Sequence, residues 1–60
     1  MKTVVITKSG VSSKGHKYFQ CTTFEGDFEI QYFVMLHENA DMDKYAIGME
    51  VTVPAAALRS

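Results

Sequence analysis

The chain of 60 residues contains one cysteine, one proline and no tryptophan. Because Cys21 has no partner in the same chain, no intramolecular disulfide can form, and nothing in the cysteine content indicates an oxidising compartment. Cys21 stands in an apolar, aromatic stretch, which predicts a buried structural thiol. A chain of this length predicts a single domain, residues 1–60, and leaves too few residues to enclose the deep pocket of a multi-step enzyme.

Long apolar runs are also lacking. The longest uncharged run, from Ile30 to Leu36, contains a glutamine and is far too short to span a membrane. The N-terminal segment carries Lys2 but no apolar core, so we expect no signal peptide. These absences favour a cytoplasmic protein.

Acidic residues are missing from the first third of the chain. Residues 1–20 hold four lysines and no Asp or Glu, whereas residues 21–50 hold all seven acids and a single lysine, Lys44. The net charge of −1 at pH 7 therefore conceals +4 in the first segment beside −6 in the second. Such an asymmetry predicts one basic face.

β-Branched and aromatic residues predict an all-β protein. Strands are expected over residues 3–7, 17–24, 28–36 and 49–53, and a two-residue turn at Gly26-Asp27 would join the second and third strands in a hairpin. Residues 39–44 predict one short helical turn, because a capping residue precedes two acids. Residues 55–58 fit either a helical turn or a last short strand. The pattern therefore predicts a small antiparallel barrel of four to five short strands, and with only four strands the barrel would be incomplete and need a partner.

Alternation along these strands predicts which side chains share a face. In the last strand Met49, Val51 and Val53 are expected to face the interior. In the hairpin, the face expected to form the core combines Phe19, Cys21, Thr23, Ile30, Tyr32 and Val34. The opposite face mixes polar residues with three rings, those of Tyr18, Phe24 and Phe33. These rings either belong to a sheet that is buried on both sides, or contact another chain or a ligand.

No set of residues predicts catalysis, a cofactor or a metal ion. The segment from Gly10 to Lys17 has the two glycines of a phosphate-binding loop but lacks its Lys-Ser/Thr pair and the helix that follows. The acids near His37 do not have the spacing of a calcium loop. We therefore expect a protein that is not an enzyme and has no small-molecule substrate.

The segment from Lys8 to Lys17 fits single-stranded nucleic acid. It is expected to be a mobile Gly/Ser loop that also holds Lys14 and His16 and leads directly into Tyr18. Cations on such a loop can follow phosphates, and aromatic rings can stack on unpaired bases for about 1–3 kcal/mol each without reading sequence. The plain alternative is a solvated hairpin loop whose lysines serve solubility.

Two motifs resemble the single-stranded DNA-binding protein family of filamentous phages. In that family Ser-Gly-Val-Ser, two further residues, Gly, a basic residue and, one residue later, Tyr form the tip of a DNA-binding wing. Residues 9–18 read Ser-Gly-Val-Ser-Ser-Lys-Gly-His-Lys-Tyr. The family's Tyr-Ala-x-Gly, followed by an alternating strand, is matched by residues 45–53. The resemblance covers most of residues 7–58.

The resemblance implies an OB-like barrel that forms a two-fold homodimer and coats single-stranded DNA cooperatively, without sequence preference, in the cytoplasm of a bacterial host. Lys8 would match a phosphate-binding cation, and Tyr18 the wing tyrosine that stacks on a base. Two positions depart from the pattern. Ser13 stands where the family has an arginine, and Gln20 where it has an apolar residue.

The sequence thus predicts a single-stranded DNA-binding protein of a phage or mobile element, with RNA as a second ligand and with no cofactor or metal. The predicted site residues are Lys8, Lys14, His16, Lys17, Tyr18 and Phe33. The alternative is a small phage-type barrel that modulates a host protein through protein–protein contact. The acidic segment from Glu25 to Glu50 would then be the contact surface.

Overall fold

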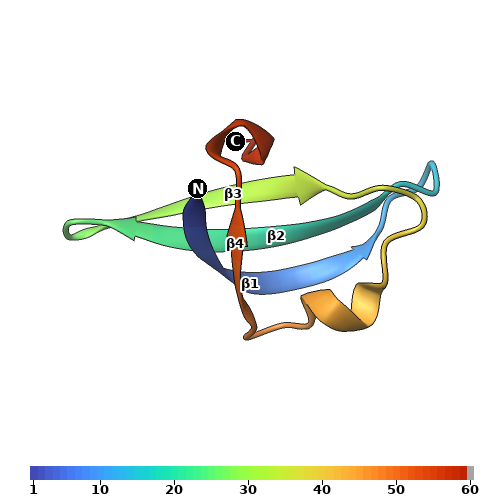
Figure 1. Cartoon of the computed structure of the whole chain (residues 1–60), viewed down its shortest axis with the longest axis horizontal. Coiled ribbons are helices and arrows are strands. Elements are labelled where there is room, and N and C mark those ends of the chain that lie inside the picture. Colours follow the sequence, from blue (N-terminus) through green and yellow to red (C-terminus); the bar gives the residue numbers. More distant parts are fainter. Residues whose placement is uncertain (60) are drawn as a thin grey trace.

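The computed structural model describes residues 1–59. Its elements follow in the order β1 (Lys2–Val11), β2 (Lys17–Glu25), β3 (Phe28–Met35), the 3-10 turn η1 (Met42–Tyr45), β4 (Glu50–Val53) and the 3-10 turn η2 (Ala55–Ala57) (Figure 1). No α-helix occurs in this part of the chain, which confirms the predicted all-β class. Within the same residues, no helix has the length and apolar character needed to cross a membrane.

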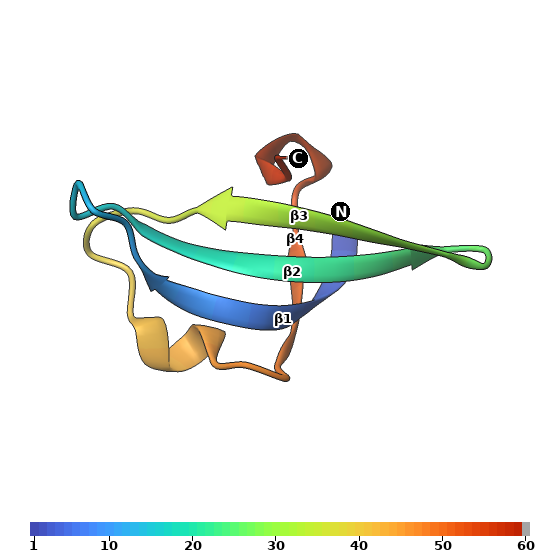
Figure 2. The same cartoon turned by 180° about the vertical axis from the view of Figure 1, so that it is seen from behind.

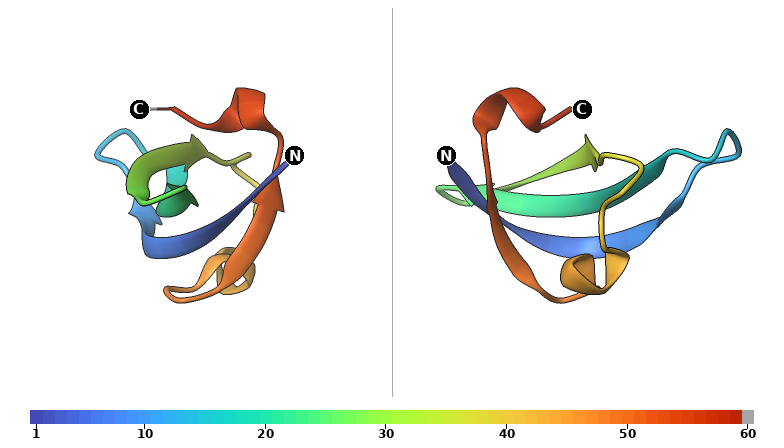
Figure 3. Two further views of the ribbon diagram at one scale, coloured as in Figure 1. Left: turned by 90° about the vertical axis from the view of Figure 1, so that its left-hand side faces the viewer. Right: turned by 45° about the vertical axis from the view of Figure 1, so that its right-hand side comes forward.

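The four strands form one antiparallel sheet in the order β3-β2-β1-β4. β1 is shared between two partners, because Lys2 to Val5 pair with β4 and Val5 to Val11 pair with β2. A bulge between Ile6 and Lys8 adds one residue to β1 and bends it from one partner toward the other. The end-on view shows the curled sheet that results (Figure 3, left).

The segment after β4 brings the two edges of the sheet together. Pro54 follows the last residue of β4, η2 turns the chain, and Arg59 exchanges two backbone hydrogen bonds with Phe33 of β3, at 2.7 and 2.9 Å. Both face-on views show this segment beside β3 (Figures 1 and 2). Residues 55–58, for which the sequence allowed a turn or a strand, make the turn, and strand-like pairing is confined to Arg59. The sheet is therefore barrel-like. Within residues 1–59 it has four strands, and the bridge between Phe33 and Arg59 joins the segment after β4 to the edge formed by β3.

The predicted hairpin turn at Gly26-Asp27 is confirmed. Glu25 lies opposite Phe28, and the β2–β3 ladder runs without interruption to the far end of β3. Gly26 has a φ of 62°, the left-handed region that a two-residue hairpin turn requires and that glycine adopts without steric cost. Because this turn sets the register, the predicted division of side chains between the two faces of the hairpin is also confirmed.

The core lies on the inner face of the curled sheet. Its buried apolar residues are Val4, Ile6, Phe19, Cys21, Val34 and Val53. Val51 packs against this cluster as expected, but Met49 is 40% exposed. Met49 lies in the turn before β4, where its N–H donates to the carbonyl of Ala46 at 3.1 Å, so the alternation of the strand does not extend to it.

η1 covers the core beside β1 (Figure 2). Asp41 caps the turn by accepting a hydrogen bond from the N–H of Asp43 at 3.0 Å. Tyr45 stacks on the fully buried Phe19, with ring centroids 5.3 Å apart and 13° between the ring planes. The helical turn predicted over residues 39–44 is thus confirmed, with its start at Met42.

The segment from Lys8 to Lys17 is not the long loop that the sequence predicts. β1 continues to Val11 and β2 begins at Lys17, so only residues 12–16 form a loop. Gly10 pairs as a strand residue, and the hydroxyl of the cross-strand Tyr18 lies 3.8 Å from the position that a Cβ at Gly10 would occupy. Small residues that are typical of a loop are here held in the sheet by pairing with β2.

Burial raises the pKa of the Cys21 thiol, because an apolar environment disfavours the thiolate. We expect a thiol reagent at pH 8 to react with the native protein at least about tenfold more slowly than with the urea-unfolded chain. The thiol loses its proton more readily in the unfolded chain than in the native protein. The contribution of this burial to the free energy of unfolding is therefore full below the ordinary pKa of 9.0 and declines as the pH rises above it. Equal reaction rates in the native and unfolded protein would refute the burial.

Candidate nucleic-acid interface

A row of side chains crosses the outer face of the sheet. Lys8 of β1 lies opposite Gln20 of β2, and Gln20 lies opposite Phe33 of β3. Phe33 in turn pairs with Arg59. Directly paired residues of antiparallel strands point to the same face, so the row reads Lys8, Gln20, Phe33, Arg59. It carries a cation at each end.

The length of this row suits an extended strand of nucleic acid. Its ends are three strand spacings apart, which is about 14 Å between backbones. A nucleotide of a stacked strand covers about 3.4 Å and one of an extended strand covers more, so the row spans at most about four nucleotides. Lys8 and Arg59 are both exposed, so their charges are accessible to phosphates.

Two further side chains flank the row on the same face. Tyr18 precedes Gln20 by two residues on β2, and Gln31 precedes Phe33 by two residues on β3. Tyr18 and Phe33 are both half-buried and are diagonal neighbours on adjacent strands, about 7–8 Å apart between backbones. The outer face therefore offers the rings of Tyr18 and Phe33 close to the glutamines, and the more exposed ring of Phe24 lies further along β2.

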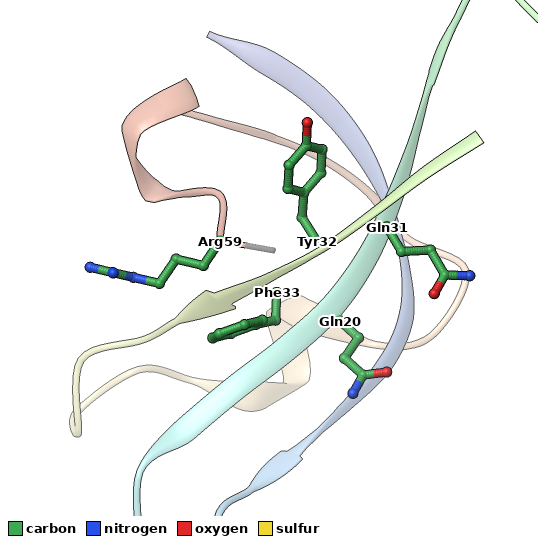
Figure 4. Close-up of a pocket in the computed structure, with 5 residues that line it drawn as sticks. All are labelled: Gln20, Gln31, Tyr32, Phe33 and Arg59. Carbon is green, nitrogen blue, oxygen red and sulfur yellow. The ribbon is translucent and has the colours of Figure 1, made fainter. Parts of the chain in front are cut away.

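A hollow of about 180 Å³ opens beside Phe33 and is lined by Gln20, Gln31, Tyr32, Phe33 and Arg59. Figure 4 shows the Phe33 ring between Arg59 on one side and the two glutamines on the other, while Tyr32 leaves β3 in the opposite direction. Pockets for small molecules usually measure about 300–1,000 Å³. The hollow is therefore large enough for only part of a larger ligand.

Three of the six predicted site residues share the outer face, namely Lys8, Tyr18 and Phe33. Lys14 and His16 lie exposed in the loop of residues 12–16, at one end of the sheet (Figure 1). Hydrogen bonds between Ser12 and His16 close this loop, and the N–H of Gly15 donates to the carbonyl of Ser12 at 2.9 Å within it. The N–H of Ser12 donates to the carbonyl of His16 at 2.7 Å, and the N–H of His16 donates to the Ser12 hydroxyl at 3.1 Å.

Lys17 points to the other face. Alternation along β2 places it on the side opposite Tyr18, and its Nζ donates to the carbonyl of Ala40 at 2.8 Å. Lys17 therefore ties β2 to the segment before η1, and the structure does not bring it together with Lys8 and Phe33.

Arg59, Gln20 and Gln31 belong to the outer face although the sequence assigns them no function. The two glutamines were recognisable as outer-face residues from strand alternation, but polar side chains at such positions are ordinary. Arg59 reaches this face only because η2 turns the chain back to β3, and no local pattern signals that return.

Three of the acidic residues have partners within the chain. Glu25 forms an ion pair with Lys2, and the hydrogen bond that the Lys2 ammonium group donates to Glu25 raises the pKa of Lys2 because it stabilises the charged form. Glu29 accepts a hydrogen bond from the hydroxyl of Thr22 at 3.1 Å. Asp41 caps η1. These acids are thus engaged in holding turns and strands together.

Within residues 1–59, no three His, Cys, Asp or Glu side chains are grouped so that they could hold a metal ion. Comparison of the chain with protein-family models, with curated proteins and with solved structures found no match. A function for this protein therefore has to be inferred from the geometry and chemistry of its outer face.

Replacing Lys17 by methionine is expected to lower the free energy of unfolding by about 1 kcal/mol, because it leaves the partly buried carbonyl of Ala40 without its donor. Urea unfolding followed by circular dichroism measures the change. Lys14→Met, at an exposed loop position, is the matched control and should change the stability by less than about 0.5 kcal/mol. Equal free energies of unfolding for the two variants would contradict the assignment of a structural role to Lys17.

Proposed function

We propose that the protein binds single-stranded DNA on the outer face of its sheet and catalyses no reaction. One observation carries this proposal, the row in which Phe33 lies between the cations Lys8 and Arg59 on the outer face of the antiparallel sheet. The cations contact phosphates, and the rings of Phe33 and Tyr18 stack on unpaired bases. The same contacts are available to RNA.

A single strand suits this face better than a duplex does. Stacking on a protein ring needs a base whose flat side is exposed, and in a duplex the neighbouring base pairs cover these sides. Each such stack stabilises a complex by about 1–3 kcal/mol. Because the row contains only two cations, the electrostatic share of the affinity is small, and the slope of log K against log salt is expected to be shallow, about −0.7 per phosphate contact.

The resemblance of residues 9–18 to the wing of the filamentous-phage family supports the same function. In this protein the segment forms the outer end of the β1–β2 hairpin, with Lys14 and His16 exposed at its tip. We assign these two residues a second, weaker contact with phosphates beyond the sheet. A phage or mobile-element protein of this kind would act in the cytoplasm of a bacterial host.

A function in protein–protein contact through the acidic segment has less support. Glu25, Glu29 and Asp41 are already engaged within the chain, by Lys2, by Thr22 and by the start of η1 respectively. The acids that remain lie on several different turns and strands rather than in one row. The outer face is therefore the better candidate for the functional surface.

We also propose that two chains associate through the edge of β3. Phe33 directs its backbone N–H and C=O away from β2, toward Arg59. By the alternation of antiparallel ladders, Glu29 and Gln31 direct theirs to the same side, where the part of the edge before Phe33 is open. Phe28, at the start of this edge, is 75% exposed. Antiparallel pairing of this edge with its copy would cover Phe28 and satisfy these backbone groups.

The binding proposal is tested by titrating fluorescein-labelled oligo-dT at several salt concentrations and following anisotropy. Lys8→Gln and Arg59→Gln, each alone, are expected to weaken binding at low salt about three- to tenfold and to make the salt slope shallower by about 0.7, because each removes one phosphate contact. Lys44→Gln, on η1, is the control with the same change of charge and should bind like the wild type. Absence of wild-type binding at low salt, or an equal loss in Lys44→Gln, would overturn the proposal.

The dimer proposal is tested by sedimentation velocity at micromolar concentration, where the wild type is expected to sediment as a dimer. Phe28→Lys places a charge at the open edge of β3 and should give a monomer. Phe24→Lys is the matched control, because Phe24 is 65% exposed but faces the outer side of the sheet. A monomeric wild type, or dissociation by Phe24→Lys alone, would count against pairing of this edge.

A further inference from the structure

We infer that the hollow beside Phe33 holds one base and that Gln20 and Gln31 give it a preference for adenine. This inference rests on the proposed binding of single strands, because it concerns the same face. It goes beyond that proposal by assigning sequence selectivity to particular side chains, whereas the phosphate contacts and the ring stacking carry none.

The two glutamines have the free hydrogen-bonding groups that recognition of a base requires. Both are exposed, and both extend to the same side of the Phe33 ring (Figure 4). Among the side-chain hydrogen bonds of residues 1–59, none involves either carboxamide. Each therefore offers an oxygen acceptor and an N–H₂ donor to a ligand.

The register places these groups at the edge of a base stacked on Phe33. Gln20 lies directly opposite Phe33, and Gln31 is two residues away on the same strand and the same face. Gln20 and Gln31 are thus diagonal neighbours, about 7–8 Å apart between backbones, and both line the hollow. In Figure 4 both carboxamides point away from the Phe33 ring, and rotation of these long, exposed side chains would bring them to the edge of a single base on the ring.

Adenine is the base that matches two adjacent carboxamides best. A carboxamide pairs with an edge that has one donor and one acceptor, and N6 with N7 of adenine is the pair that glutamine recognises in bidentate fashion. In an unpaired adenine, N6 with N1 forms a second such edge. In guanine N1–H with O6 forms one such edge, but N7 with O6 has two acceptors, which the carboxamide oxygen opposes, so guanine cannot pair in this way with both glutamines along N1, position 6 and N7. Cytosine and thymine have a single ring and therefore less surface to stack on Phe33.

Arg59 completes the site on the other side of the ring. Its guanidinium lies across Phe33 from the glutamines, as Figure 4 shows. A nucleotide whose base edge meets Gln20 and Gln31 would direct its sugar and phosphate toward the opposite side, where a cation can bind the phosphate. The hollow therefore has separate groups for the ring, the base edge and the phosphate of one nucleotide.

The test compares short strands that differ in a single base. The probes are a fluorescein-labelled oligo-dT of about eight nucleotides, within the usual range of single-strand site sizes, and the same strand with one central adenine, guanine or cytosine. We expect the strand with adenine to bind at least about fivefold more tightly than oligo-dT, the lower end of the discrimination that a bidentate contact gives. Both Gln20→Met and Gln31→Met keep the side-chain length but remove the amide, so each should lower the ratio between the affinities for the strand with adenine and for oligo-dT, whatever its effect on oligo-dT itself.

Asn39→Met is the matched control, since it removes an exposed carboxamide outside the outer face and should keep the full preference for adenine. Equal binding of all four strands by the wild type would overturn the inference while the proposed function stands. A preference for adenine that persists in both glutamine variants would overturn the assignment to these residues. Failure of every strand to bind would remove the proposed function itself, and the inference with it. Thermal unfolding of each variant shows whether it is folded before its affinity is compared.

Discussion

The two backbone hydrogen bonds between Phe33 and Arg59 determine both the shape of the sheet and the composition of its outer face. They join the segment after η2 to β3, which brings the last part of the chain across from β4 to the opposite edge of the sheet. Because paired residues share a face, the same two bonds place a guanidinium beside an aromatic ring. A short chain thereby closes its sheet and completes its candidate interface with one contact, and a loss of this bridge would affect both.

Much of the fold follows from local patterns in the sequence. The turn at Gly26-Asp27 fixes the register of β2 with β3, and a fixed register decides which residues of both strands face inward, including the buried Phe19 and Val34. The true length of β1 was not predictable in this way. Ser9 and Gly10 are typical of a loop, and it is the pairing with β2 that holds them in a strand, a long-range interaction that propensity does not describe.

The candidate site was predictable to the extent that strand alternation defines it. Alternation places Tyr18 and Phe33 on the outer face, and Lys8 joins them once β1 is known to continue past the bulge. The position of Lys17 depends on an acceptor from a distant segment, the carbonyl of Ala40, and that of Arg59 depends on the return of the chain through η2. Neither contact leaves a signal in the neighbouring residues. The charge asymmetry of the sequence therefore indicated a basic face but could not identify all of its cations.

The central claim is that single-stranded DNA binds on the outer face of the sheet. It is tested most directly by ¹H–¹⁵N correlation spectra recorded while oligo-dT is added at low salt. We expect the largest chemical-shift changes at the backbone amides of Lys8, Gln20, Phe33 and Arg59, with those of residues 42–45 in η1 unchanged. Changes confined to residues 37–45, with the outer face unaffected, would contradict the claim.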